Sequence, residues 1–274
     1  MQWDKVKNIL IVILLAVNLF LLSNLGAKAW QSKRHAEELD DNLRALLAGY
    51  EQTLDEDFRL PQDKVLPLLS LDRSRADEEA AAGAMLGGGM TRTEQEDGTV
   101  FFESETGSLE WGADGVVRGR CETGQPAPAN ENAALRLART LLTRWGLQAE
   151  DAAYTTDGLS VTMTGTIAGQ PVHNRLLTLR FDQAGLAELS GLWTFGTPYT
   201  TARESGVSCV ASDALLAFAA NAEPGGKILS MTAGYRLQSD SSRRLQFTPT
   251  WKITTDSGEY LVDCAKKMPV TQEN

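Results

Sequence analysis

The chain has 274 residues, 42% of them hydrophobic and 23% charged, which is ordinary for a globular protein of one or two domains. Its formal net charge of −10 argues against nucleic acid as a partner, because nucleic-acid-binding proteins need a basic surface. The three cysteines have no CxxC or Cys/His spacing, which argues against a zinc site and thioredoxin-like chemistry.

An uncharged apolar stretch, Ile9–Ala27, lies near the start of the chain. As a helix rising about 1.5 Å per residue it spans about 28 Å, close to the hydrocarbon thickness of a bilayer. Trp3 and Trp30 flank it at the positions expected for the two headgroup regions. The sequence therefore predicts a single-pass protein of the cell membrane, with residues 1–8 in the cytoplasm and the C-terminal domain outside the cell.

A cleaved signal peptide is the alternative interpretation of this stretch. Lys5 and Lys7 precede the apolar run, and Ala27–Ala29 fits a small-x-small cleavage site. The run is longer than the usual about 7–15 residues of a signal peptide, and a helical pattern continues directly after it. These two features favour a retained anchor, and both interpretations export the remainder of the chain.

Asn18 places an amide near the middle of the apolar stretch. An amide in hydrocarbon favours a hydrogen-bonding partner on a neighbouring helix. Two interpretations stay open, a single tolerated polar residue or a contact between helices inside the membrane. The second predicts that the contact is made by Asn18, Phe20, Leu22 and Ser23.

A helical stalk is expected over residues 28–59, because apolar residues recur there at spacings of three, four and seven. These residues are Leu39, Leu43, Leu46, Leu47, Tyr50 and Leu54. The segment Leu60–Leu69 contains two prolines and is expected to end the stalk. It opens a small region, residues 60–129, in which Arg73–Ala84 is expected to form a short helix.

Residues 90–121 are expected to form an antiparallel β-meander. Short β-prone runs at Thr99–Glu103, Ser108–Gly112 and Val116–Cys121 are separated by Thr-Gly and Asp-Gly turns. The triple glycine at 87–89 is not expected to bind phosphate, because it lacks a following Lys and Ser/Thr at a helix start.

A helix followed by three strands is predicted twice. In the first unit, residues 130–205, Asn130 is expected to cap the helix Glu131–Trp145. Its strands are expected at Leu159–Ile167, Val172–Phe181 and Leu186–Phe195. The alternation of apolar and polar residues in them indicates a sheet with one buried face.

The second unit spans residues 206–274 and repeats this pattern. Ser212 is expected to cap the helix Asp213–Asn221, and a shared core would let the two units pack together. The strands are expected at Lys227–Gln238, Leu245–Thr255 and Glu259–Cys264. The predicted fold class is therefore α+β, an N-terminal transmembrane helix and stalk followed by a β-meander and two helix-plus-antiparallel-sheet repeats.

Large and sulfur-containing side chains are expected in the core. The four tryptophans of the predicted domain read as core anchors: Trp111, Trp145, Trp193 and Trp251. Isolated buried thiols are favoured for Cys121, Cys209 and Cys264. A Cys209–Cys264 disulfide is the alternative if the domain lies in an oxidising space.

Enzymatic motifs are missing from the sequence, including HExxH, GxSxG and Ser-x-x-Lys. The two histidines, His35 in the stalk and His173 at a strand start, are expected to be structural. No catalytic residue, cofactor or metal is therefore predicted. A surface patch from Trp193 to Tyr199 is retained as an alternative site for wall ligands.

Both ends of the chain resemble YycI-type proteins of the YycH/YycI family. The opening MQWDKVKNILIVILLAVNLFLL is similar to the tail and membrane span with which these proteins begin. Residues 227–235, 247–253 and 258–262 are similar to the family's ending, K-I, G-Y, P-x-W-x-I/V and G-x-Y-x-V.

The resemblance implies a non-enzymatic regulator with an extracytoplasmic domain. Its membrane helix would contact a sensor histidine kinase of the cell-wall two-component system, alongside a YycH-like protein. The alternative is an exported PepSY-like binding module that holds a peptide, a protease or a cell-wall ligand. An exported hydrolase is disfavoured by the missing motifs.

Overall fold

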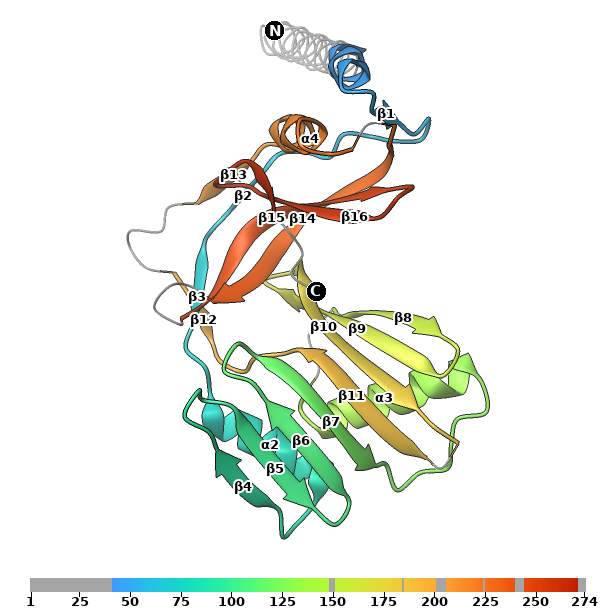
Figure 1. Ribbon diagram of the computed structural model, residues 1–274, viewed down its shortest axis with the longest axis vertical. Coiled ribbons are helices and arrows are strands. Elements are labelled where there is room, and N and C mark those ends of the chain that lie inside the picture. Colours follow the sequence, from blue (N-terminus) through green and yellow to red (C-terminus); the bar gives the residue numbers. More distant parts are fainter. Residues whose placement is uncertain are drawn as a thin grey trace, which may run out of the picture.

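The computed structural model describes residues 41–147, 151–183, 185–200, 206–223, 225–239 and 244–270. The fold is α+β, as the sequence predicted, and is built around a 15-stranded mixed sheet. The described residues form two lobes, and each lobe has its own hydrophobic core (Figure 1). The central lobe comprises residues 75–192, and the terminal lobe comprises residues 41–71 and 207–270.

The central lobe contains two helices and eight strands of the sheet. They are α2 (Arg75–Leu86), β4 (Thr91–Glu94), β5 (Val100–Ser104), β6 (Gly107–Trp111), β7 (Val116–Glu122), α3 (Glu131–Arg144), β8 (Ala153–Asp157), β9 (Ser160–Ile167), β10 (Gln170–Phe181) and β11 (Leu186–Leu192). The strand order is β8-β9-β10-β11-β7-β6-β5-β4, with every pair antiparallel. The predicted meander and the helix of the first unit are confirmed, and β8 was missed.

Both helices of the central lobe cover the same face of its sheet (Figure 1). The side chain of Asn130 accepts a hydrogen bond from the Ala133 amide at 3.0 Å, which confirms the predicted cap of α3. Gly146 ends this helix with φ +69°, a conformation that glycine adopts without strain. The opposite face of the sheet carries no helix among the residues that the structure describes.

The terminal lobe combines the two ends of the described chain. It contains a helix over residues 41–49, β1 (Thr53–Leu54), β2 (Lys64–Leu66), β3 (Leu69–Leu71), β13 (Val207–Cys209), α4 (Ala211–Ala219), β14 (Lys227–Ser239), β15 (Leu245–Thr255), β16 (Glu259–Asp263) and β17 (Met268–Val270). The short β12 (Pro198–Tyr199) pairs with β3 where the chain returns from the central lobe. The three strands predicted for the second unit are confirmed as β14, β15 and β16.

The predicted stalk ends sooner than expected. The described part of its helix stops at residue 49, and Leu54 lies in β1, which pairs in parallel with the start of β14. Leu43 and Leu47 are buried, but Leu46 and Tyr50 are 53% and 46% exposed. The helical pattern to residue 59 was therefore wrong, because pairing with a distant strand overrides the local periodicity.

The cap predicted for the second unit's helix was also wrong. Ser212 lies inside α4, which begins at Ala211 and has no side-chain hydrogen bond from its own N-cap residue, Val210. The carboxylate of Asp63 instead accepts the Ala211 amide at 2.8 Å. A residue distant in sequence thus satisfies one of the free amides at this helix start. The Leu60–Leu69 segment that supplies it contains strand β2 and the start of β3.

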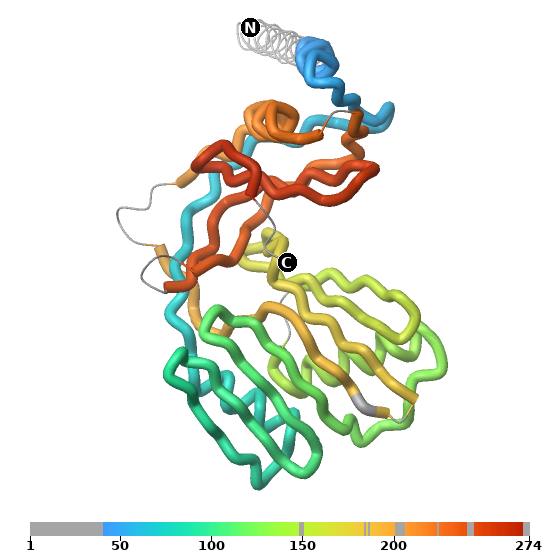
Figure 2. Tube along the Cα trace, in the orientation of Figure 1, coloured from blue at the N-terminus to red at the C-terminus, as the bar shows by residue number. Residues whose placement is uncertain are grey.

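The two predicted units do not form a single core, although Val172 of the first unit is buried in the terminal-lobe core. In the central lobe β11 pairs with β7, so the first unit and the meander enclose a common core. The second unit packs with residues 41–71 instead. The lobes meet where β10 runs in parallel beside β14, with Val172 opposite Tyr235. Figure 2 follows the chain through this junction.

No helix within the described ranges is long and apolar enough to cross a membrane. The predicted span, Ile9–Ala27, lies outside those ranges.

Candidate functional site

A hollow of about 600 Å³ lies on the helix-free face of the central-lobe sheet. This surface, called the open face below, is toward the viewer in Figure 1, with α2 and α3 behind it. Its polar and aromatic lining comes from five neighbouring strands and their turns: Phe101, Glu103, Ser108, Glu110, Arg118, Arg120, Arg180, Asp182 and Glu188.

Strand alternation explains why charged residues gather there. On β7, Val117 and Cys121 point into the core, so Arg118 and Arg120 point to the open face. The sheet register then sets opposite charges side by side, with Glu188 between Arg120 and Arg180. Cross-strand pairs of this kind stabilise a sheet by roughly 0.2–1 kcal/mol each.

The charges of the open face remain available to a ligand. Arg120 and Asp182 form an ion pair at 3.0 Å, but their side chains are 61% and 41% exposed. Exposed pairs of this kind contribute little to stability, so their exchange for ligand contacts is inexpensive. With both signs of charge and the half-buried Phe101 ring, the surface suits a ligand with both hydrogen-bond donors and acceptors.

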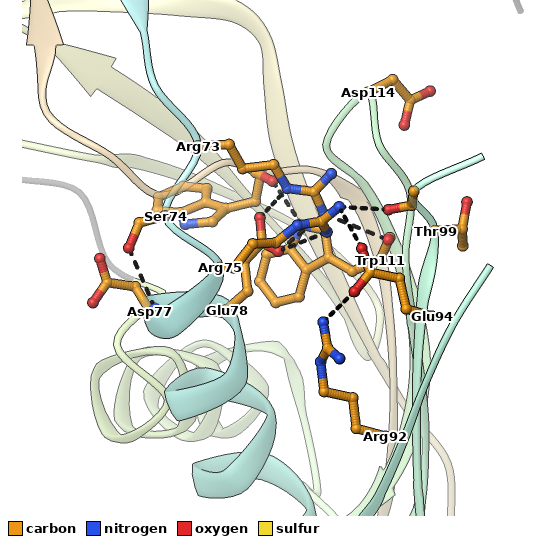
Figure 3. Close-up of polar contacts among 12 residues, drawn as sticks. Arg73, Ser74, Arg75, Asp77, Glu78, Arg92, Glu94, Thr99, Trp111 and Asp114 are labelled. Atoms are coloured by element: carbon orange, nitrogen blue, oxygen red, sulfur yellow. Dashed lines mark hydrogen bonds and ion pairs between the residues drawn. The ribbon is translucent and has the colours of Figure 1, made fainter. Parts of the chain in front are cut away.

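A second charged cluster lies at the start of α2 (Figure 3). Both oxygens of the Glu78 carboxylate receive hydrogen bonds from Arg73, through Nε and through Nη2, the latter at 2.9 Å. Arg75 joins it at 3.3 Å and donates to the Gly98 carbonyl at 2.7 Å. The Glu78 side chain is 1% exposed. The cluster ties the helix to the meander, and its satisfied hydrogen bonds assign it a structural role.

The junction between the lobes is built from three consecutive residues of β10. They lie where the pairing of β10 with β9 shifts register, between Pro171 and Leu176. His173 and Asn174 face the terminal lobe, whereas Arg175 faces Trp193. The Asn174 amide donates to the Leu237 carbonyl at 2.7 Å and accepts the Leu237 amide at 2.8 Å, so a side chain extends the pairing of two strands. The Arg175 guanidinium lies 3.7 Å from the centre of the Trp193 ring.

Burial lowers the pKa values of two side chains at this junction. It lowers the pKa of Arg175 to about 10, which leaves the guanidinium charged at neutral pH. It also lowers the pKa of His173 to about 4, and the nearby Lys252 cation adds to this effect. His173 is therefore neutral at pH 7, as a half-buried structural histidine would be.

The core predictions can be compared with the structure directly. All four tryptophans are buried, which confirms them as core anchors. Trp193 is 1% exposed and belongs to the central-lobe core, so it does not contribute to the predicted Trp193–Tyr199 surface patch, whereas Tyr199 is half-buried. The three cysteines are buried free thiols.

The predicted membrane contact lies outside the described residues, namely Asn18, Phe20, Leu22 and Ser23. Within the described ranges, no three His, Cys, Asp or Glu side chains gather as a possible metal site. Sequence reasoning missed the open face, although the alternation of arginines along Val116–Cys121 was a usable signal. The pairing of β7 with β11, which assembles the face, had no local signal.

Comparisons with known proteins found likeness in structure but not in sequence. The chain matches no protein-family model and no curated protein. Its fold is similar to the crystal structure of an uncharacterized protein from Eubacterium rectale ATCC 33656, at 9% sequence identity and a TM-score of 0.49. That match covers 81% of this chain and 91% of the other.

Proposed function

We propose that this chain is a non-enzymatic, membrane-anchored regulator of a sensor histidine kinase. The helix Ile9–Ala27 would contact the kinase's membrane helices, and a YycH-like protein would join the assembly. The uncharged stretch and the resemblance at both ends of the chain support this proposal.

The observation that carries the proposal is the uncharged stretch Ile9–Ala27, and the burial of Leu43 and Leu47 shows how the chain after it joins the terminal lobe. They are 4% and 0% exposed, and they pack in the same core as α4 and β15. Residues 41–49, which come after the proposed membrane stretch in the sequence, are therefore part of the folded lobe.

The energy required for such regulation is small. A tenfold shift between two kinase states needs about 1.4 kcal/mol of differential binding. One interhelical hydrogen bond from an amide contributes roughly 0.6–2 kcal/mol in a membrane. A hydrogen bond from the Asn18 amide thus has a free energy of the required size, provided that the bond forms in one kinase state and is absent in the other.

Co-purification from membranes tests this function. We expect the kinase to be retained with the native chain, lost when Ile9–Ala27 is replaced by an unrelated apolar anchor, and reduced about tenfold by Asn18→Leu. Asn24→Leu is the matched control, because it removes an amide nearer the end of the stretch and should leave retention unchanged. Equal retention with the replaced anchor would contradict the proposal.

The open face favours a second candidate function, a binding module for a cell-wall ligand or peptide. Its hollow of about 600 Å³ is within the usual size range of ligand sites, and its charges are exposed. In this function the membrane helix only tethers the domain, so binding would persist when the anchor is exchanged.

Sedimentation with purified cell wall separates this second function from the first. We expect the full chain in detergent to bind, and the double change Arg118→Ala and Arg120→Ala to weaken binding about tenfold. Arg136→Ala is the control, because that exposed arginine lies on α3, across the sheet from the open face. If the double change leaves binding to the cell wall unaltered, the open face is not the binding site.

A further inference from the structure

Two cysteines that are distant in sequence lie in the terminal-lobe core. Cys209 ends β13 and Cys264 directly follows β16, and the interaction between the two thiols lowers the pKa of Cys209 and raises that of Cys264. A small cavity gives separate evidence that the two cysteines are neighbours. It is lined by Cys264 together with Ser208 and Val210, the residues on either side of Cys209.

The backbone around the two cysteines is held in place without the thiols. Strand β13 pairs with β2, which sets Cys209 opposite Lys64. The Cys264 amide donates to the Pro249 carbonyl at 3.0 Å. An ion pair of 2.7 Å between Lys267 and Asp213 joins the turn after β16 to α4. The two cysteines are thus held as neighbours by fixed elements.

We propose that Cys209 and Cys264 are a redox pair that closes to a disulfide when the terminal lobe meets a disulfide-containing oxidant. One cysteine thiolate attacks the oxidant, forms a mixed disulfide and releases one thiolate. The second cysteine loses its proton and attacks the first cysteine's sulfur, which forms the S–S bond and releases the second thiolate. The pair gives up two protons and two electrons, and the oxidant is reduced to two thiols.

The third cysteine lies elsewhere. Cys121 belongs to the central-lobe core, apart from the other two cysteines, and burial raises the pKa of its thiol to about 11. The three cysteines therefore divide into one neighbouring pair and one residue in the other core.

Closure of the pair would strengthen the lobe that continues from the predicted anchor. The bond joins the residues before α4 to the end of β16, and so encloses α4, β14, β15 and β16. A disulfide that closes a loop of this length restricts the unfolded chain and is expected to raise the melting midpoint of the lobe by about 5–15 °C. Closure in the cell rests on the proposed extracytoplasmic location, because disulfides persist in oxidising compartments.

Thiol counting on the full chain in detergent tests the pair, with oxidised glutathione as the oxidant. After oxidation of the folded protein, denaturation and maleimide labelling, we expect one reactive thiol, at Cys121, and a chain lighter by two hydrogen atoms. The variant Cys121→Ser should keep the bond and leave no reactive thiol. Cys209→Ser and Cys264→Ser should each abolish the reductant-sensitive shift in melting midpoint.

The outcomes separate this inference from the proposed function. Three reactive thiols after oxidation, or a bond that includes Cys121, would contradict the proposed redox pair. The native chain, compared with and without reductant, gives this result even if a serine variant fails to fold. If the bond forms in the purified protein but the chain taken directly from cells carries three thiols, the pair stands and the extracytoplasmic location of the proposed function fails.

Discussion

Glu78→Ala is expected to lower the free energy of unfolding of the central lobe by about 3–5 kcal/mol. The Glu78 carboxylate is 1% exposed and receives two hydrogen bonds from Arg73, whose side chain is 12% exposed. Without the carboxylate, the Arg73 guanidinium stays in the interior with its charge uncompensated. Urea unfolding followed by tryptophan fluorescence suits the measurement, because Arg73 also contacts the carbonyl of buried Trp111.

Two further variants separate the charge effect from a general effect on the helix. Glu79 is the next residue of α2 and is exposed, so Glu79→Ala should change the free energy by no more than about 0.5 kcal/mol. The double change Arg73→Met and Glu78→Met should recover most of the loss, because apolar pairs often replace buried ion pairs without penalty. A loss for Glu78→Ala no larger than that for Glu79→Ala would show that the ion pair does not hold the lobe together.

The stability of the lobe junction is expected to fall by up to about 3 kcal/mol as the pH drops from 7 to 4. Burial lowers the pKa of His173 from 6.5 to about 4, with a further contribution from Lys252, which itself pairs with Glu259 at 2.8 Å. Between these two pKa values the unfolded chain binds a proton that the folded chain does not. The stabilisation is thus fully present above pH 6.5 and is progressively lost below it.

Melting midpoints measured at several pH values check this expectation. His173→Gln should flatten the pH dependence between pH 6.5 and 4, because the residue no longer titrates in either state. His35→Gln is the control, since it removes the other histidine, which the sequence places in the exposed stalk, and should leave the slope unchanged. Parallel curves for the native chain and His173→Gln would rule out this histidine as the cause.

Features of the fold that depend on neighbouring residues were predictable from the sequence. Asn130 caps α3 because its side chain bonds to an amide three residues away. The strands β9, β10 and β15 follow from period-two alternation. The four buried tryptophans follow from the large apolar area of each ring.

Features that depend on distant contacts were not predictable in the same way. Strand β8 was missed because its residues are mostly exposed and carry no alternation of apolar residues. Ser212 was predicted to cap α4, but the Asp63 carboxylate accepts the Ala211 amide instead, and Asp63 lies near the start of α4 only in the folded chain. Thr53 and Leu54 form strand β1 and not part of the predicted stalk helix, because they pair with β14.

By itself the sequence determined the α+β class, most helices and strands, the buried tryptophans and an apolar stretch long enough to span a membrane, because each depends on residues a few positions apart. Only the tertiary structure decided that two cores form, that arginines from β7 and β10 share one open face, and that Cys209 and Cys264 lie in the same core. These features depend on which strands pair, and that choice is made by burial and hydrogen bonding summed over the whole chain.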